Sequence, residues 1–196
     1  MRRTVRTDRV VALTFDDGPD PENTPQVLAL LAQYRVVATF CMIGAKAARH
    51  PELVRAVVAA GMRLCDHTAT HNQHLAHRPE PQIEAEIVGG RADLLTAAGS
   101  DVTIEYFRAP AGRWSEPMRH IAARHGMKPL SWSVDPRDWS RPGVAQIVTA
   151  VQQQVQPGAV IVMHDGGGQR DQTVAALATL LPWLVGQGYQ FDVPGR

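Results

Sequence analysis

This sequence has little of what marks a membrane protein, a nucleic-acid-binding protein or a disulfide scaffold. Its 20 lysines and arginines face 19 aspartates and glutamates, so the formal net charge is only +1. A chain without a basic excess lacks the electrostatic surface that nucleic acids and anionic membranes select. No apolar run approaches the roughly 18 residues of a transmembrane helix. The two cysteines, Cys41 and Cys65, have the wrong count and spacing for a structural zinc site. We expect a globular protein with no nucleic-acid partner and no transmembrane segment.

Apolar runs and helical patterns alternate along the chain, and no linker-like stretch interrupts them. Strands are predicted at residues 10–15, 36–42, 63–66, 104–107, 129–134, 160–163 and 189–192. Helices are predicted at residues 24–31, 51–60, 80–98, 116–125, 144–155 and 172–185. Strands that alternate with helices predict an α/β protein with a parallel sheet. The spacing favours one domain over residues 1–196, with its motif-bearing core at 10–192, folded as a (β/α) barrel of about seven parallel strands. A doubly wound open sheet is the alternative.

Acidic and histidine side chains follow two of the predicted strands. Asp16 and Asp17 end the first strand, and two adjacent carboxylates repel each other unless a cation or a proton compensates one of them. A simple Asp-Gly-Pro turn is the other interpretation. His67 and His71 follow the third strand, four residues apart, so both can reach one metal ion from a turn or a curled loop. One of the carboxylates would complete the three protein ligands of a catalytic zinc-type site, with the fourth position left to water.

Three further polar clusters also stand at strand ends. These are the segments Phe107-Arg108-Ala109-Pro110-Ala111-Gly112, Asp135-Pro136-Arg137-Asp138-Trp139 and Ile161-Val162-Met163-His164-Asp165. An arginine at such a position can hold a carboxylate through two hydrogen bonds. In a parallel α/β fold the carboxyl ends of the strands share one edge, so the five clusters are expected to meet there. The three glycines at 166–168 lack the Lys-Ser/Thr of a phosphate-binding loop, which predicts a flexible loop.

The blocks TFDDGP, HTATH, RAPAG, DPRDW and VMHD resemble, in this order, the five motifs of the polysaccharide deacetylase family (carbohydrate esterase family 4, the NodB homology domain). They extend from Thr14 to Asp165. Each motif alone is weak, but five in order, each after a strand, are specific. The resemblance implies a distorted (β/α) barrel. It also implies Asp17, His67 and His71 as ligands of one divalent metal ion, usually zinc, with cobalt or nickel as alternatives.

The resemblance also implies a division of labour among the remaining motif residues. Asp16 would be the general base and His164 the general acid. Arg108 and the Asp135/Asp138 motif would orient them, and a carboxylate such as Asp135 would raise the pKa of His164. The backbone N–H of Ala111 would hold the oxyanion, although the family usually carries an aromatic residue where this chain has alanine.

An apolar pocket for the acetyl methyl group is expected close to these motifs. Trp139 together with Ile161, Val162 or Met163 could form its wall, and ordinary core packing is the alternative for the aliphatic side chains. Because alanine replaces the aromatic residue of the third motif, the side-chain wall of the sugar site is where this chain departs from the pattern.

The expected activity is N-deacetylation of N-acetylglucosamine residues in peptidoglycan or chitin oligomers, by a monomer. O-deacetylation of acetylxylan and a non-catalytic carbohydrate-binding relative are the alternatives. Cys41 and Cys65 fall on strands that would be neighbours in such a barrel, so a disulfide and two free thiols are both compatible with the sequence. A disulfide would favour export. No signal peptide follows Arg2-Arg3. We expect a secreted or cell-envelope enzyme whose leader lies outside this sequence, and a cytoplasmic location stays open.

Overall fold

A curled parallel sheet forms the centre of the computed structural model, which describes residues 1–4, 8–99 and 102–195. Its strands are β1 (Val10–Asp16), β2 (Ala38–Met42), β3 (Arg63–Asp66), β4 (Tyr106–Phe107), β5 (Lys128–Pro129), β6 (Val160–His164) and β7 (Gln190–Phe191). They run in the order β5-β4-β3-β2-β1-β6, β7 also pairs with β1, and every paired strand is parallel to its neighbour. This arrangement confirms the predicted fold class.

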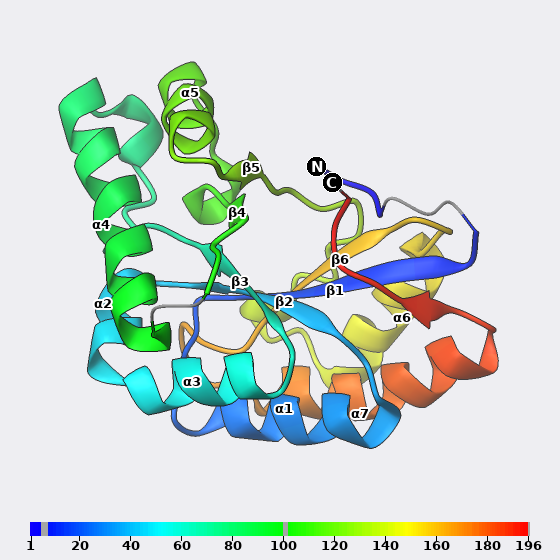
Figure 1. Ribbon diagram of the computed structural model, residues 1–196. Coiled ribbons are helices and arrows are strands. Elements are labelled where there is room, and N and C mark those ends of the chain that lie inside the picture. The colour runs from blue at the N-terminus through cyan, green and yellow to red at the C-terminus, as the bar shows by residue number, and fades with distance from the viewer. Residues whose placement is uncertain (5–7, 100–101, 196) are drawn as a thin grey trace.

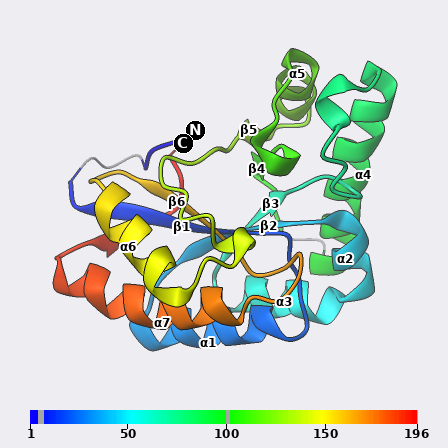
Figure 2. The same cartoon turned by 180° about the vertical axis from the view of Figure 1, so that it is seen from behind.

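Helices cover the convex face of the sheet and its two ends. They are α1 (Asn23–Tyr34), α2 (Gly44–Arg49), α3 (Pro51–Ala59), α4 (Glu80–Ala98), α5 (Glu116–Arg124), α6 (Val144–Gln154) and α7 (Asp171–Gly186). Three short 3₁₀ turns follow strands, at Leu75–His77, Pro110–Gly112 and Asp138–Ser140. Figure 1 shows α1, α3 and α7 side by side below the sheet, with α4 and α5 beyond one end. The reverse view in Figure 2 shows α6 beside α7 at the other end. None of the described helices is long and apolar enough to cross a membrane.

The two faces of the sheet carry different side chains, because successive residues of a strand point in opposite directions. In β1, Val11, Leu13 and Phe15 belong to the large core beneath the helices. Ala12 belongs to a smaller apolar cluster on the opposite face, which also contains Cys41 and Cys65. The two cysteines are opposite each other in the β2–β3 register and form a disulfide. The concave face therefore has a small cross-linked base, and polar side chains stand nearer the carboxyl ends of the strands.

The barrel is not closed by strand pairing between β5 and β6. Val134 and Ile161 form an isolated parallel bridge there. The first residues of the chain fill the rest of the gap: Arg3 pairs with Ala159, and the Met1 carbonyl accepts a hydrogen bond from Ser131. Both chain ends lie close together over the concave face (Figure 1).

Several elements differ from the sequence-based expectation, most clearly two strands and one helix. The strand predicted at 104–107 shortens to Tyr106–Phe107, and the one predicted at 129–134 is replaced by the two-residue strand Lys128–Pro129. The Leu130 N–H still donates to Phe107 of β4, but the chain beyond Leu130 pairs instead with the N-terminal segment and β6. The helix α2 was not predicted, because six residues are too few for a recognisable helical period. It packs against α4, where Gly44 is so close to Gly90 that an added Cβ would lie 2.8 Å from its Cα.

Candidate active site

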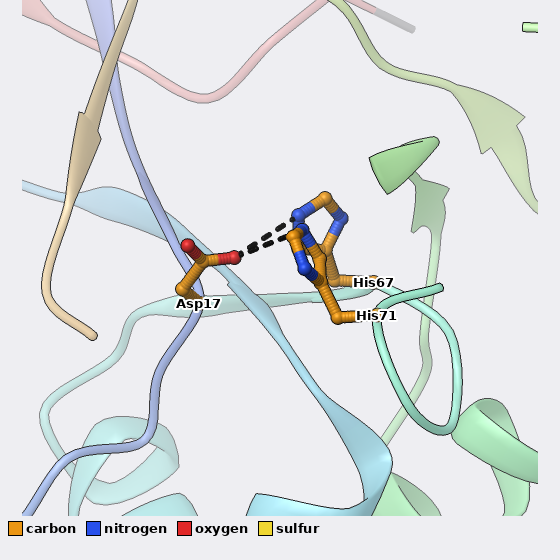
Figure 3. Close-up of side chains that lie close together, drawn as sticks. All are labelled: Asp17, His67 and His71. Carbon is orange, nitrogen blue, oxygen red and sulfur yellow. Dashed lines mark ion pairs between the residues drawn. The ribbon is translucent and has the colours of Figure 1, made fainter. Parts of the chain in front are cut away.

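Asp17, His67 and His71 converge on one point at the carboxyl ends of β1 and β3 (Figure 3). Asp17 Oδ1 lies 3.5 Å from His67 Nε2 and 3.2 Å from His71 Nε2. The three potential ligand atoms all lie within 4.8 Å of one another. Asp17 Oδ1 is buried, and among the described residues it makes no hydrogen bond apart from these contacts with the two imidazoles. A buried carboxylate oxygen facing two imidazole nitrogens is a donor set that suits a divalent cation, so these residues fit a metal ion.

The local backbone gives this cluster its shape. Asp17, Thr68 and His71 have positive φ angles of 70°, 68° and 59°. The segment after β3 is therefore a curled loop rather than a helical turn, and the Thr68 hydroxyl accepts a hydrogen bond from the His71 N–H. His67 Nδ1 lies 2.8 Å from the Arg108 carbonyl oxygen, which can only accept, so Nδ1 carries the proton. His67 Nε2 is left with its lone pair facing the site.

Charge and burial adapt these side chains to hold a cation. Burial works to raise the pKa of Asp17, but the hydrogen bond and charge of His67, with the charge of His71, hold that pKa below its ordinary value. Burial and the charge of His67 lower the pKa of His71. Burial lowers the pKa of His67, whereas Asp16 and Asp17 raise it and prevail. Asp17 is thus anionic and His71 is biased to its neutral form, as metal ligation requires, whereas the raised pKa of His67 means that a metal ion would have to displace a proton from that ring.

Asp16 has different partners from its neighbour Asp17, because the two residues point to different sides of the strand end. Arg108, which is fully buried, donates from Nη1 to Asp16 Oδ1 at 2.5 Å and to the Thr14 hydroxyl at 2.9 Å. Asp16 Oδ2 lies 3.8 Å from His67 Nε2, beside the metal-type cluster. The structure therefore brings together an arginine-held carboxylate and the Asp-His-His set.

A histidine–carboxylate pair, His164 with Asp138, completes the group of polar side chains at the bottom of the site, which is called the polar floor below. His164 is opposite Asp16 in the β1–β6 register, and its Nδ1 lies 2.8 Å from Asp138 Oδ1. The other oxygen of Asp138 accepts from the His164 backbone N–H and from the Thr173 hydroxyl, both at 2.8 Å. Burial lowers the pKa of His164, but the bond to Asp138 and its charge outweigh that and raise it to about 9. The imidazolium form is thus stable at neutral pH.

Asp135 does not pair with His164, so the expectation that it raises the pKa of this histidine was wrong. Its Oδ1 accepts from the backbone N–H of Arg137 within its own turn, and the residue lines the pocket wall. The turn between the two aspartates carries Arg137 with φ 54°, and this reversal delivers Asp138 rather than Asp135 to the histidine.

A cleft of about 470 Å³ opens above the polar floor. Its walls include Ala111, Trp132, Trp139 and Val162. Met163 is not part of the wall: it belongs to the core beneath the helices, because it points to the opposite face of β6 from Val162. Ala111 is exposed, with φ 52°.

Trp132 was missed in the sequence. Its indole contacts Gly112 so closely that an added Cβ there would lie 2.6 Å from Cη2. Trp132 follows Leu130, an inner-face residue, by two positions, and this alternation was the available signal.

The glycine segment 166–168, predicted to be a flexible loop, lies in close contact with Asp17. A Cβ on Gly166 would lie 2.1 Å from the Asp17 carbonyl oxygen, and one on Gly167 would lie 2.6 Å from Asp17 Oδ2. The loop after β6 is therefore packed directly against the Asp-Gly-Pro turn after β1, and Arg170 lines the cleft beside it.

A parallel α/β fold with an Asp-His-His set and a histidine–carboxylate pair in one cleft is typical of hydrolases that activate water. The comparisons give the family. The family model for polysaccharide deacetylases matches residues 3–130. The chain is 42% identical over 189 residues to a chitooligosaccharide deacetylase of Sinorhizobium fredii, covering 91% of this chain and 87% of that protein. It is 40% identical over 186 residues to a peptidoglycan-N-acetylglucosamine deacetylase of Bacillus cereus, covering 94% and 85%.

Solved structures agree with this assignment. A peptidoglycan N-acetylglucosamine deacetylase in complex with 4-naphthalen-1-yl-N-oxidanyl-benzamide superposes with a TM-score of 0.91 at 31% identity. The match covers 98% of this chain and 89% of that one. The chain belongs to the polysaccharide deacetylase family and is a hydrolase of that type, which confirms the resemblance of its five motifs.

Proposed function

We propose that this enzyme removes acetyl groups from N-acetylglucosamine residues of chitin oligomers or peptidoglycan, with one divalent metal ion, zinc in the simplest case. One observation carries the proposal: a single cleft brings together the buried Asp17 Oδ1, the imidazoles of His67 and His71, and His164. Asp138 holds the His164 ring through a hydrogen bond. The names of the two relatives at 42% and 40% identity support this substrate class.

Asp17, His67 and His71 would hold the cation. A bound divalent ion supplies Lewis acidity: it lowers the pKa of water from about 16 towards about 7 and polarises the acetyl carbonyl. The surrounding residues bind the substrate and transfer the protons. Asp16, kept in place through the bond from Arg108 to Oδ1, accepts a proton from the attacking water.

His164 acts at the other end of the reaction. Its Nδ1 is occupied by Asp138, so Nε2 is the atom that donates a proton to the departing nitrogen. The backbone N–H of Ala111, which also lines the cleft, is assigned to the carbonyl oxygen as negative charge develops on it. Trp139 and Val162 border the space for the acetyl methyl group.

An amide substrate suits this site better than an ester. An amine is a poor leaving group unless it is protonated, whereas an alkoxide can depart with less help. A histidine whose pKa is raised to about 9 is protonated at neutral pH, and this favours N-deacetylation over O-deacetylation of acetylxylan. Both Asp16 and His164 are present and partnered, which argues against a non-catalytic relative.

Acetate release from a small set of acetylated glycans tests the proposal. We expect release from N-acetylglucosamine tetramers, pentamers or peptidoglycan, loss of release on chelation, and recovery on adding zinc. Faster release from acetylxylan than from any N-acetylated glycan would replace the amidase assignment with the esterase one. Full activity in metal-free protein would contradict the role given to Asp17, His67 and His71.

A further inference from the structure

Arg170 is a buried cation that pairs with backbone carbonyls rather than with a carboxylate. Its side chain is 5% exposed at the start of α7. Nε donates to the Gly166 carbonyl at 2.7 Å, and Nη2 donates to the Gly167 carbonyl at 3.0 Å. Nη1 reaches the carbonyls of Gln169 and Trp139 at 3.2 and 3.4 Å. Within the described parts of the chain, no carboxylate lies within ion-pair distance of this guanidinium. A buried charge of this kind needs a reason, because removing it from water is costly.

The carbonyls that Arg170 holds belong to the loop on which Asp17 rests. Gly166 and Gly167 lie against the carbonyl and carboxylate of Asp17, at distances that no residue with a Cβ could reach without displacing it. Gly167 also has φ 77°, a conformation that disfavours other residues. The contact therefore depends on the path of the loop. The backbone N–H groups of Asp165 and Gly166 hold the start of the loop through the Asp16 carbonyl. Arg170 holds the next part through the carbonyls of Gly166 and Gly167.

Asp17 needs such external support. Its φ of 70° lies in the left-handed region, which costs free energy for a non-glycine residue and persists only where the surroundings enforce it. Lys46 Nζ holds the Asp17 carbonyl at 2.7 Å from one side. The glycine loop packs against the same carbonyl and against Oδ2, and these contacts hold the residue whose Oδ1 faces the two imidazoles.

We propose that Arg170 is a positioning residue that sets the affinity of the site for its metal ion, by clamping Gly166 and Gly167 against Asp17. This inference rests on the proposed function, in which Asp17 is a metal ligand. Thr173, one helical turn further along α7, supports a different part of the site, because its hydroxyl donates to Asp138. The first turn of α7 thus holds the metal-binding half through Arg170 and the proton-donating half through Thr173.

The clamp predicts effects that a general loss of packing would not produce. Arg170→Met keeps the aliphatic stem and removes every donor, so we expect the dissociation constant for zinc to rise about 10- to 100-fold, the usual effect of losing support behind a metal ligand. Arg170→Lys can still donate to one or two carbonyls and should restore part of the affinity. At saturating zinc, the kcat of Arg170→Met should recover towards the wild-type value. The fall of kcat at alkaline pH should occur at the same pH as in wild type, since the His164–Asp138 pair is intact.

Arg141→Gln is the matched control. Arg141 lies in the same region but bonds to the exposed side chains of Gln169 and Asp171, so its zinc affinity should equal that of wild type. Thr173→Val should show the reverse pattern, with zinc affinity retained and the alkaline limb displaced. The measurement is zinc competition with a chromophoric chelator, on variants whose fold is checked by circular dichroism.

The result that overturns the proposal is a folded Arg170→Met protein that binds zinc as wild type does, including one that has merely lost thermal stability. If Arg170→Met does not fold, the zinc affinity of Gly167→Ala is the test, because this substitution directly disturbs the same contact with Asp17. Gly167→Ala with unchanged zinc affinity would overturn the clamp equally. Absence of zinc binding in the wild-type protein is a separate result, and refutes the proposed function itself.

Discussion

Replacing Asp138 by asparagine tests how the general acid is kept protonated. The carboxylate is 1% exposed and contacts the His164 ring, the His164 backbone and the Thr173 hydroxyl. Asparagine has the same shape and keeps an oxygen for two of these contacts. It loses the negative charge that counteracts burial and raises the pKa of His164 to about 9. Burial still opposes the charged ring while Asp16 and Asp17 still favour it, so the pKa should fall to about 6.5, its ordinary value.

The size of the effect depends on pH. At pH 8 the protonated fraction of His164 falls from about nine-tenths to about one-thirtieth, so the rate should drop roughly 30-fold or more. At pH 6 both forms of the enzyme keep most of the proton, and the rates should differ by less than about twofold from this cause. Because the pKa is raised in the folded state, the pair also stabilises the fold below about pH 6.5, and this stabilisation is lost as the pH rises through about 9.

The assay is the pH dependence of kcat for acetate release, beside an NMR titration of the imidazole in the metal-free protein. The matched control is Asp135→Asn, which removes a carboxylate three residues away that does not contact His164; its alkaline limb should coincide with that of wild type. An equal loss at pH 6 and pH 8 in Asp138→Asn would refute the reasoning, because it would show misplacement of the ring rather than loss of its proton.

Other changes separate the remaining roles. Asp16→Asn should cost about 100- to 10,000-fold in turnover while zinc still binds, the range for a general base; near-normal turnover would rule out that role. His71→Ala should lose zinc and activity together, measured by metal analysis and acetate release, and zinc retained at full stoichiometry would remove it from the ligand set. Replacing both Cys41 and Cys65 by alanine should lower the free energy of unfolding by about 3 kcal/mol, since the disulfide closes a loop of 24 residues; an unchanged urea midpoint would contradict this. Ala111→Tyr should add a side chain to the cleft wall and lower KM more than it changes kcat, and steady-state kinetics on N-acetylglucosamine pentamers would expose an effect confined to kcat.

The sequence by itself determined which strands carry the chemistry. Parallel strands end at one edge of a sheet, so polar residues that follow apolar runs must gather there, wherever the strands fall in the order. Asp17, His67 and His71 come together for this reason, and Asp16 and His164 occupy opposite positions on β1 and β6. The alternation of side chains along a strand also contained more information than was used. Neighbouring residues face opposite sides, so Val162 lines the cleft while Met163 enters the core, and the same rule places Trp132 on the inner face.

The tertiary structure decided the contacts that loops make with one another. Whether Asp135 or Asp138 reaches His164 depends on a left-handed residue, Arg137, and a residue pattern does not specify such a reversal. The pairing of Cys41 with Cys65 required the β2–β3 register. Arg170 looks like an ordinary charged residue before a helix. It becomes significant only when the pairing of β6 with β1 brings its glycine loop against Asp17, about 150 positions earlier in the chain. Side-chain type and strand order are local properties of the sequence, whereas the path of a loop is set by everything that packs around it.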